Sequence, residues 1–138
     1  MPETGNHSFP RTERLKSTKI IERLFLEGRK VKAFPMVVRY MDTPLPEAVP
    51  CQAMVSVSKR AFKRAVDRNR IKRLMREAWR LQKKPLLEAW STDETQKALV
   101  FIFVGKEMPT FESIQRGMAT AIEKLSVEGT PTPPNTHS

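Results

Sequence analysis

Apolar residues first recur at helical spacing near the start of the chain, and they predict a helix over residues 18–27. Ser17 is a suitable N-cap, because its hydroxyl can accept a hydrogen bond from a first-turn N–H. Gly28 suits the left-handed conformation that often follows a helix. The apolar positions of this helix are Ile20, Ile21, Leu24 and Phe25.

Strand patterns follow. Residues 31–41 are rich in strand-forming side chains, and Pro35, which has no N–H to donate, separates them into two short strands. Three prolines make residues 42–50 a connecting loop. Residues 52–58 then alternate strictly, which predicts a half-buried strand with one apolar face and one face of small polar groups open to a ligand. The apolar set is Ala53, Val55 and Val57, and the other set is Met54, Ser56 and Ser58.

A second helix is predicted over residues 67–84, with Asp67 as its cap and Pro85 marking its end. At about 100° per residue its side chains separate into two arcs. The core arc consists of Ile71, Leu74, Met75, Ala78 and Leu81. The cationic arc consists of Arg68, Asn69, Lys72, Arg73, Arg76 and Arg80. Residues 86–96 should form a less regular connection, with a helical turn around Trp90.

The run 98–104 is continuously apolar, as in a central strand that is covered on both faces. A third helix is predicted over residues 111–125, with Pro109 just ahead of it. Its inward positions are Ile114, Met118, Ile122 and Leu125. Residues 1–8 are expected to be a flexible N-terminus and the proline-rich residues 126–138 a disordered tail. Residues 9–125 then form a single α+β domain, a layered sandwich of helix, two or three strands, helix, strand and helix.

Composition and charge limit the location of this domain and the class of its partner. The chain has 138 residues, a net charge of +10 and one cysteine, Cys51, which excludes an internal disulfide and makes the cytoplasm the expected location. Its longest apolar run is far shorter than the roughly 20 residues that span a bilayer. Residues 59–84 hold twelve basic and two acidic side chains, so this segment alone accounts for the whole net charge. Its partner must be acidic: nucleic acid, an anionic membrane surface or an acidic protein.

The sequence offers no catalytic residue of its own. The only histidines, His7 and His137, lie near the two ends, so neither a Cys and His metal cluster nor a nucleophile–base pair is predicted. Cys51 is most simply a half-buried thiol at the end of a strand. Glycine is scarce, which argues against a phosphate-binding glycine-rich loop.

The cationic arc favours nucleic acid. Arg68, Lys72, Arg76 and Arg80 follow each other at intervals of four, and unpaired like charges at this spacing repel one another unless an anion is bound. Arginine makes forked contacts with phosphate, whereas a membrane-surface helix needs large apolar residues beside its basic face. Trp79, at the border of the arcs, either stacks on a base or, more commonly for such a residue, packs half-buried against the sheet.

Residues 68–77 match the pattern RNRxKRLxRE at every specified position, and in this they resemble the bacterial ribonuclease P protein subunit. Other matches are Phe9, Pro10, Arg11, Arg14 and Leu15, then Phe25 and Gly28, then the strand and basic residues from Val55 to Arg60. The resemblance covers about residues 9–125. It implies a two-layer α+β sandwich of order α-β-β-β-α-β-α, similar to a ribosomal-protein domain, with a left-handed β-α-β crossover.

The resemblance also implies a function. Such a protein binds the catalytic RNA subunit and the 5′ leader of precursor tRNA, and the complex removes the leader. Mg²⁺, held mainly by the RNA subunit and the substrate, supports the chemistry. No membrane and no protein partner are implied. The residues implied to contact the RNA subunit are Arg68, Asn69, Arg70, Lys72, Arg73 and Arg76, with Lys59, Arg60 and Lys63 adjoining.

The leader is implied to lie between the first helix and the sheet. The residues assigned to this cleft are Arg11, Arg14, Phe25 and Arg39. Two positions depart from the family pattern: Ile21 and Arg39 replace common aromatics, while Tyr40 should point to the opposite face. Leader binding is therefore expected to be more electrostatic than usual. For Phe25, a core role and a stacking role both stay open.

Two other classes remain as alternatives. One is a structural RNA-binding protein, such as a ribosomal protein of similar fold, for which a basic helix suffices. The other is an adaptor for a membrane surface or an acidic protein. The complete signature, joined to the preceding Val-Ser-Val-Ser-Lys strand, favours ribonuclease P over a structural RNA-binding protein. The absence of an exposed apolar stripe from the sequence disfavours the adaptor.

Overall fold

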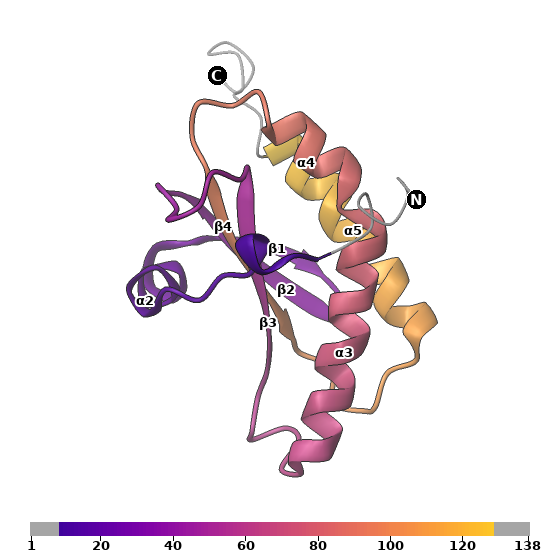
Figure 1. Cartoon of the computed structure of the whole chain (residues 1–138). Helices are drawn as coiled ribbons and strands as arrows, with labels where there is room; N and C mark the ends of the chain where they lie inside the picture. Colours follow the sequence, from indigo (N-terminus) through magenta and orange to yellow (C-terminus); the bar gives the residue numbers. More distant parts are fainter. Residues whose placement is uncertain (1–8, 129–138) are drawn as a thin grey trace, which may run out of the picture.

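The computed structural model of the chain describes residues 9–128, and Figure 1 shows their arrangement. Its elements in chain order are the 3-10 helix η1 (Arg11–Glu13), α2 (Thr18–Glu27), β1 (Arg29–Ala33), β2 (Met36–Asp42), β3 (Cys51–Val57), α3 (Ala65–Gln82), α4 (Lys84–Trp90), β4 (Lys97–Phe103) and α5 (Phe111–Glu128). The predicted α+β class is confirmed. A short η1 and a full helix α4 are added to the predicted order.

The strands form one mixed sheet in the order β1-β2-β4-β3. β1 pairs antiparallel with β2, and β2 antiparallel with β4, whereas β3 runs parallel to β4. β4 therefore lies in the interior of the sheet, and all of its residues except Ile102 are buried. This confirms the central strand that its unbroken apolar run predicts. α3 and α4 connect β3 to β4 as the predicted β-α-β crossover.

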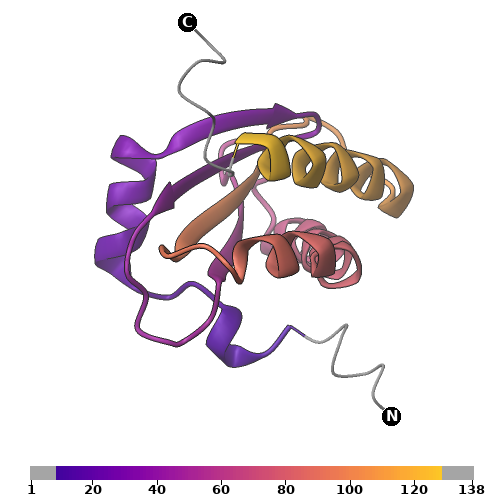
Figure 2. The ribbon, with the colours of Figure 1, turned by 90° about the horizontal axis from the view of Figure 1, so that it is seen from above.

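Side-chain alternation gives the sheet two unlike faces, and Figure 2 shows α2 on one side of it with α3, α4 and α5 on the other. The face under α3, α4 and α5 holds the larger core, in which the Trp79 ring lies 5.1 Å from that of Phe101. On the opposite face α2 covers a smaller cluster of buried residues: Leu15, Leu24, Met41, Ala98 and Val100. The rest of that face is only partly covered: at the outer edge of the sheet Gln52 of β3 is buried beside η1 and donates a 2.8 Å hydrogen bond to the Thr12 carbonyl.

The bounds of α2 and its cap are as predicted. The Ser17 hydroxyl accepts a 3.3 Å hydrogen bond from the Ile20 N–H. The left-handed conformation predicted for Gly28 is wrong: its φ of −64° and ψ of 146° are extended, because the chain passes directly into β1. Glycine is needed here for a different reason, since a Cβ would lie 2.5 Å from the Leu24 carbonyl oxygen.

α3 begins earlier than predicted. Its N-cap is Arg64, and Asp67 lies inside the first turn, where its carboxylate interacts favourably with the positive end of the helix dipole. Pro85 belongs to the first turn of α4, a position that tolerates proline because the N–H groups there have no helical partner. Residues 86–90 are thus helical rather than irregular, since Leu86 and Trp90 are buried.

One predicted core position of α3 is also wrong. Leu81 is 37% exposed, whereas Gln82 faces α5 and donates a 3.0 Å hydrogen bond to the Gln115 carbonyl. A polar helix–helix contact of this kind has no signal in a hydropathy pattern.

α5 continues past the predicted end at Leu125 to Glu128, so the first three residues of the predicted tail are helical. Ile114, Met118 and Leu125 are buried as predicted, and Ile122 packs partly against the same core. The predicted flexible residues 1–8, and 129–138 of the tail, lie outside the described residues. Between residues 9 and 128 no helix is long and apolar enough to cross a membrane.

Candidate nucleic-acid interface

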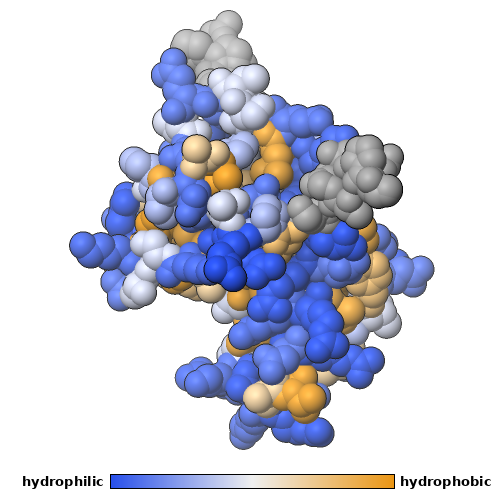
Figure 3. All heavy atoms as spheres, viewed as in Figure 1, coloured by the Kyte–Doolittle hydropathy of each residue, from blue (hydrophilic) through white to orange (hydrophobic). Residues whose placement is uncertain are grey.

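The outward side of α3 carries a row of cations that have no partner among residues 9–128. Ile71, Met75 and Ala78 turn into the core and are fully buried, which directs the intervening polar residues to the surface. Asn69, Arg70, Lys72, Arg73 and Arg76 are exposed or half-buried, and their side chains make no hydrogen bond or ion pair with any described residue. Figure 3 shows the resulting hydrophilic surface along α3. This charge is available to an external anion.

Arg68 has a different setting. Its Nη1 donates to the carbonyl oxygens of Phe62, at 2.7 Å, and Lys63, at 2.9 Å. Phe62 is itself fixed, since its N–H donates to the Ser58 carbonyl and its ring lies 5.8 Å from that of Phe103. Arg68 therefore anchors the loop of residues 58–64, which presents four exposed cations beside the start of α3. They are Lys59, Arg60, Lys63 and Arg64.

We expect Arg68→Ala to destabilise the fold by about 1–3 kcal/mol, because two carbonyls lose a charged donor. Arg73→Ala, on the exposed side of the same helix, should change stability by no more than about 0.5 kcal/mol. Urea unfolding followed by circular dichroism measures both. Equal stabilities for the two variants would show that Arg68 does not hold the loop.

Arg80 contributes less to the row than its spacing predicts. Its Nη2 lies 2.6 Å from one oxygen of Glu77, and its Nε donates to the other at 3.1 Å. The hydrogen bonds from Arg80 hold the pKa of the Glu77 carboxyl below its ordinary value. An ion pair thus ends the predicted row of four after Arg76.

The N-terminal segment lies along the same side of α3. Lys72, Arg76 and Lys83 are spaced by four and seven, which places them on one side of the helix. Lys83 is buried, forms an ion pair with Glu13 of η1, and has its Nζ 5.4 Å from the centre of the Phe9 ring. This contact joins residues 70 positions apart in sequence, so no local pattern predicts it.

The segment that carries Arg11 and Arg14 is therefore held at the C-terminal end of α3. The side chains of Arg11 and Arg14 are both exposed. Arg14 donates to the Phe9 carbonyl at 3.2 Å, and its main chain pairs with Ala53 on the outer edge of β3. In Figure 3 the hydrophilic surface continues from this segment onto α3.

The other two residues predicted for the leader cleft lie elsewhere. Arg39 points to the face that carries α2, and its Nη1 donates to the Gly28 carbonyl at 3.2 Å, just beyond the last turn of α2. Phe25, in that last turn, is 40% exposed. Arg39 aligns with Val100 and Met54 across the sheet, so Arg14 is about three strand spacings away, on the order of 14 Å. The four predicted residues thus form two separate pairs.

Between these pairs the sheet offers an open surface beside α2, which we call the open face. Its side chains are half-buried and largely apolar, consistent with the prediction that one face of β3 is accessible. They are Val37, Met54, Ser56 and Ile102. Ile21, at a position where the resemblance implies an aromatic, packs against the Leu24 cluster, and Tyr40 points to the opposite face as predicted.

Two residues considered for chemistry are buried instead. Trp79 is 2% exposed, so the alternative in which it stacks on a base is wrong; it is also more buried than the half-buried position predicted. Cys51 is also more buried than predicted, and burial raises the pKa of its thiol far above the ordinary value. Such a thiol is protonated and unreactive at neutral pH. Among residues 9–128 no three His, Cys, Asp or Glu side chains gather to hold a metal ion.

Fold and surface together define a class: an α+β sandwich whose positive charge is gathered on one helix, its preceding loop and an adjacent N-terminal segment. The family model described as Ribonuclease P matches residues 9–126. The chain belongs to the ribonuclease P protein family, whose members are protein components of an endoribonuclease that processes tRNA.

Similarity to individual ribonuclease P proteins supports the same family. The chain is 32% identical to the ribonuclease P protein component of Porphyromonas gingivalis over 126 residues, covering 91% of this chain and 92% of that one. It is 36% identical to that of Chlorobaculum tepidum over 134 residues, covering 91% and 87%. The fold is similar to the RNase P protein of Staphylococcus aureus, with a TM-score of 0.63 at 23% identity over 83% of this chain and 95% of that one. For the Thermotoga maritima RNase P protein the TM-score is 0.62 at 20% identity, covering 81% and 96%.

Proposed function

We propose that this chain is the protein subunit of a ribonuclease P ribonucleoprotein, which binds the catalytic RNA subunit through α3 and the loop 58–64. The observation that carries the proposal is the row of cations on α3 within the family signature that is unpaired among the described residues. Arg70, Arg73 and Arg76 are exposed or half-buried and have no partner among the described residues. Repulsion among them is relieved when phosphates bind.

The 5′ leader of precursor tRNA lies on the open face, between Phe25 and the half-buried side chains of β4 and β3. A single strand suits this surface, since a base can stack on the Phe25 ring and lie on the apolar side chains beside it while cations track phosphates. Arg39 supplies a charge beside Phe25. Arg11 and Arg14 lie at the outer edge of β3, so they contact RNA where the leader approaches the RNA subunit.

The chemistry is divided between protein and RNA. Mg²⁺ held by the RNA subunit and the substrate would supply the activation of the attacking water, and no residue of this chain is assigned to that step. The chain's own residues bind and orient: α3 and its loop fix the position of the protein on the RNA, and the open face holds the leader. We place this assembly in the cytoplasm, with no membrane and no further protein partner.

Reconstitution tests the proposal. The chain is combined with the catalytic RNA of a bacterial ribonuclease P at low Mg²⁺, and cleavage of precursor tRNA is compared with that by RNA alone. We expect faster removal of the leader in the presence of the protein, because its cations neutralise phosphates that otherwise require Mg²⁺. A purely structural RNA-binding protein would bind the RNA and leave the cleavage rate unchanged, which would refute the proposal.

A further inference from the structure

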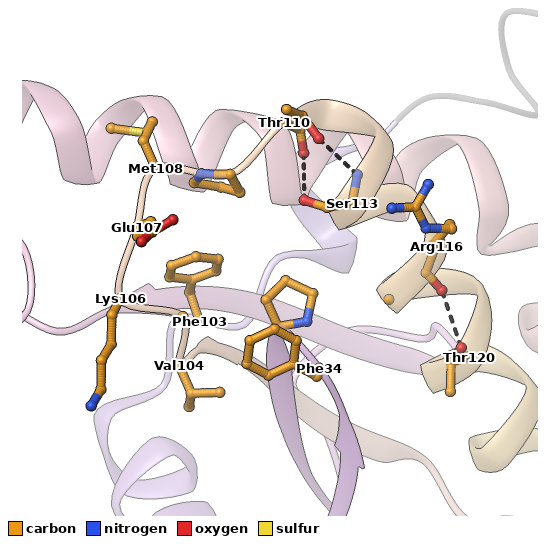
Figure 4. Close-up of a pocket in the computed structure, with 14 residues that line it drawn as sticks. Phe34, Phe103, Val104, Lys106, Glu107, Met108, Thr110, Ser113, Arg116 and Thr120 are labelled. Carbon is orange, nitrogen blue, oxygen red and sulfur yellow. Dashed lines mark hydrogen bonds between the residues drawn. The ribbon is translucent and has the colours of Figure 1, made fainter.

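A pocket of about 770 Å³ opens at the end of the molecule where β4 leaves the sheet. It lies between the β1–β2 turn, the loop from β4 to α5 and the first turns of α5, and Figure 4 shows its lining. Its walls are apolar, with Phe34, Phe103, Val104 and Met108 among them. This pocket is on the opposite side of β4 from the open face, because Phe103 belongs to the core under α3 and α5.

The pocket has rigid walls and one exposed aromatic ring. α5 approaches the β1–β2 turn closely: a Cβ at Gly117 would lie 2.9 Å from the Phe34 carbonyl oxygen and from the Pro35 ring. The Phe103 ring is held by its contact with Phe62. Phe34 is 79% exposed, so its ring presents a face for a ligand to cover.

The polar groups of the pocket differ in their availability. The Thr110 hydroxyl accepts from the Ser113 N–H, the Ser113 hydroxyl donates to the Thr110 carbonyl, and the Thr120 hydroxyl donates to the Arg116 carbonyl. These groups serve α5 itself. Three charged side chains are different, because they are exposed and have no partner among the described residues: the carboxylate of Glu107 and the two cations Lys106 and Arg116. Figure 4 places the two cations at opposite ends of the pocket, with Phe34 between them and Glu107 on the side of Lys106.

The pocket adjoins the basic loop. Lys106 also lines a smaller hollow of about 390 Å³ together with Ser58, Arg60 and Ala61. A strand bound along the loop 58–64 therefore reaches the pocket without leaving the protein surface.

We propose that this pocket takes one unpaired nucleotide of the RNA subunit, its base against Phe34 and its flanking phosphates on Lys106 and Arg116. Two cations at the ends of an apolar floor match a nucleotide within a strand, whose base is apolar on both faces and whose flanking phosphates are anionic, and these cations outnumber the one carboxylate of the lining, Glu107. A neutral protein segment or a second copy of this basic chain would leave those cations uncompensated. The inference rests on the proposed function, because it assumes that the RNA subunit binds the adjoining loop.

The test is the affinity of the full chain for a bacterial ribonuclease P RNA at fixed salt. Phe34→Ala should weaken binding by about 5- to 150-fold, the range for removal of one base-stacking ring. Phe34→Trp should retain binding. Leu26→Ala is the matched control, since Leu26 is 82% exposed on α2, away from the pocket, and it should bind as the parent chain does.

The contribution of the phosphate contacts to RNA binding is measured separately. Lys106→Ala should reduce the slope of log affinity against log salt by about 0.7 to 0.9, the value for one phosphate contact. If Phe34→Ala and Leu26→Ala bind the RNA subunit equally well, the pocket does not take a nucleotide and the inference falls. It also falls if Phe34→Ala affects only precursor tRNA binding or only self-association by light scattering. If the parent chain itself does not bind the RNA subunit, the proposed function is refuted, and this result is distinct from the loss of the pocket inference alone.

Discussion

Replacement of Arg70, Arg73 and Arg76 by alanine together should reduce the slope of log affinity against log salt by about 2 to 3, because three cations that neutralise RNA phosphates are removed. None of these guanidinium groups has a partner among residues 9–128, so each is available to displace counterions from RNA. The measurement is a filter-binding titration of the RNA subunit at several salt concentrations.

Two controls make this result specific. The variant with lysine at the same three positions keeps the charge, so its slope should stay near that of the parent chain while its forked arginine–phosphate bonds are absent. Melting curves should coincide for all three chains, because the three side chains make no hydrogen bond or ion pair with the described part of the protein. A parent-like slope in the alanine variant would place the RNA interface on another surface.

Trp79 is expected to act on stability alone. Trp79→Ala should destabilise the fold by about 3–5 kcal/mol, because the ring is 2% exposed and packs on Phe101 of the central strand, where its removal leaves a cavity. Chemical denaturation measures the change in the free energy of unfolding.

The companion variant Trp79→Phe separates stability from binding. It keeps an aromatic ring in the core, so the protein should remain folded and bind the RNA subunit with parental affinity. A large decrease of RNA affinity in folded Trp79→Phe would restore the base-stacking role that the burial of this residue contradicts.

The positions of the main elements follow from the sequence, since each has its own local pattern. The helical repeat of Ile20, Leu24 and their neighbours gives α2, the alternation at residues 53–57 gives β3, and the unbroken apolar run gives β4. The differences lie at element ends. Asp67 is the best capping residue near the start of α3 by type, yet the helix starts at Ala65, where the loop 58–64 is held by Arg68.

The candidate interface, too, is predicted only in part by the sequence. Its cationic residues on α3 are visible in sequence because charge and core positions repeat with one helical period. What the sequence does not contain is which of those charges are already paired. Arg80 is bound to Glu77 and Arg68 to two carbonyls, and such pairings depend on rotamers and on loop geometry.

By itself the sequence determined the fold class, the segment that carries the positive charge and the family, because these rest on residue type and on spacing within single elements. Only the tertiary structure decided that the segment with Arg11 and Arg14 lies at the C-terminal end of α3 rather than beside Arg39. It also decided that Trp79 is core and that Phe34, Lys106 and Arg116 surround one pocket. These relations join segments distant in the chain, and they arise from side-chain packing between elements, for which a linear pattern carries no signal.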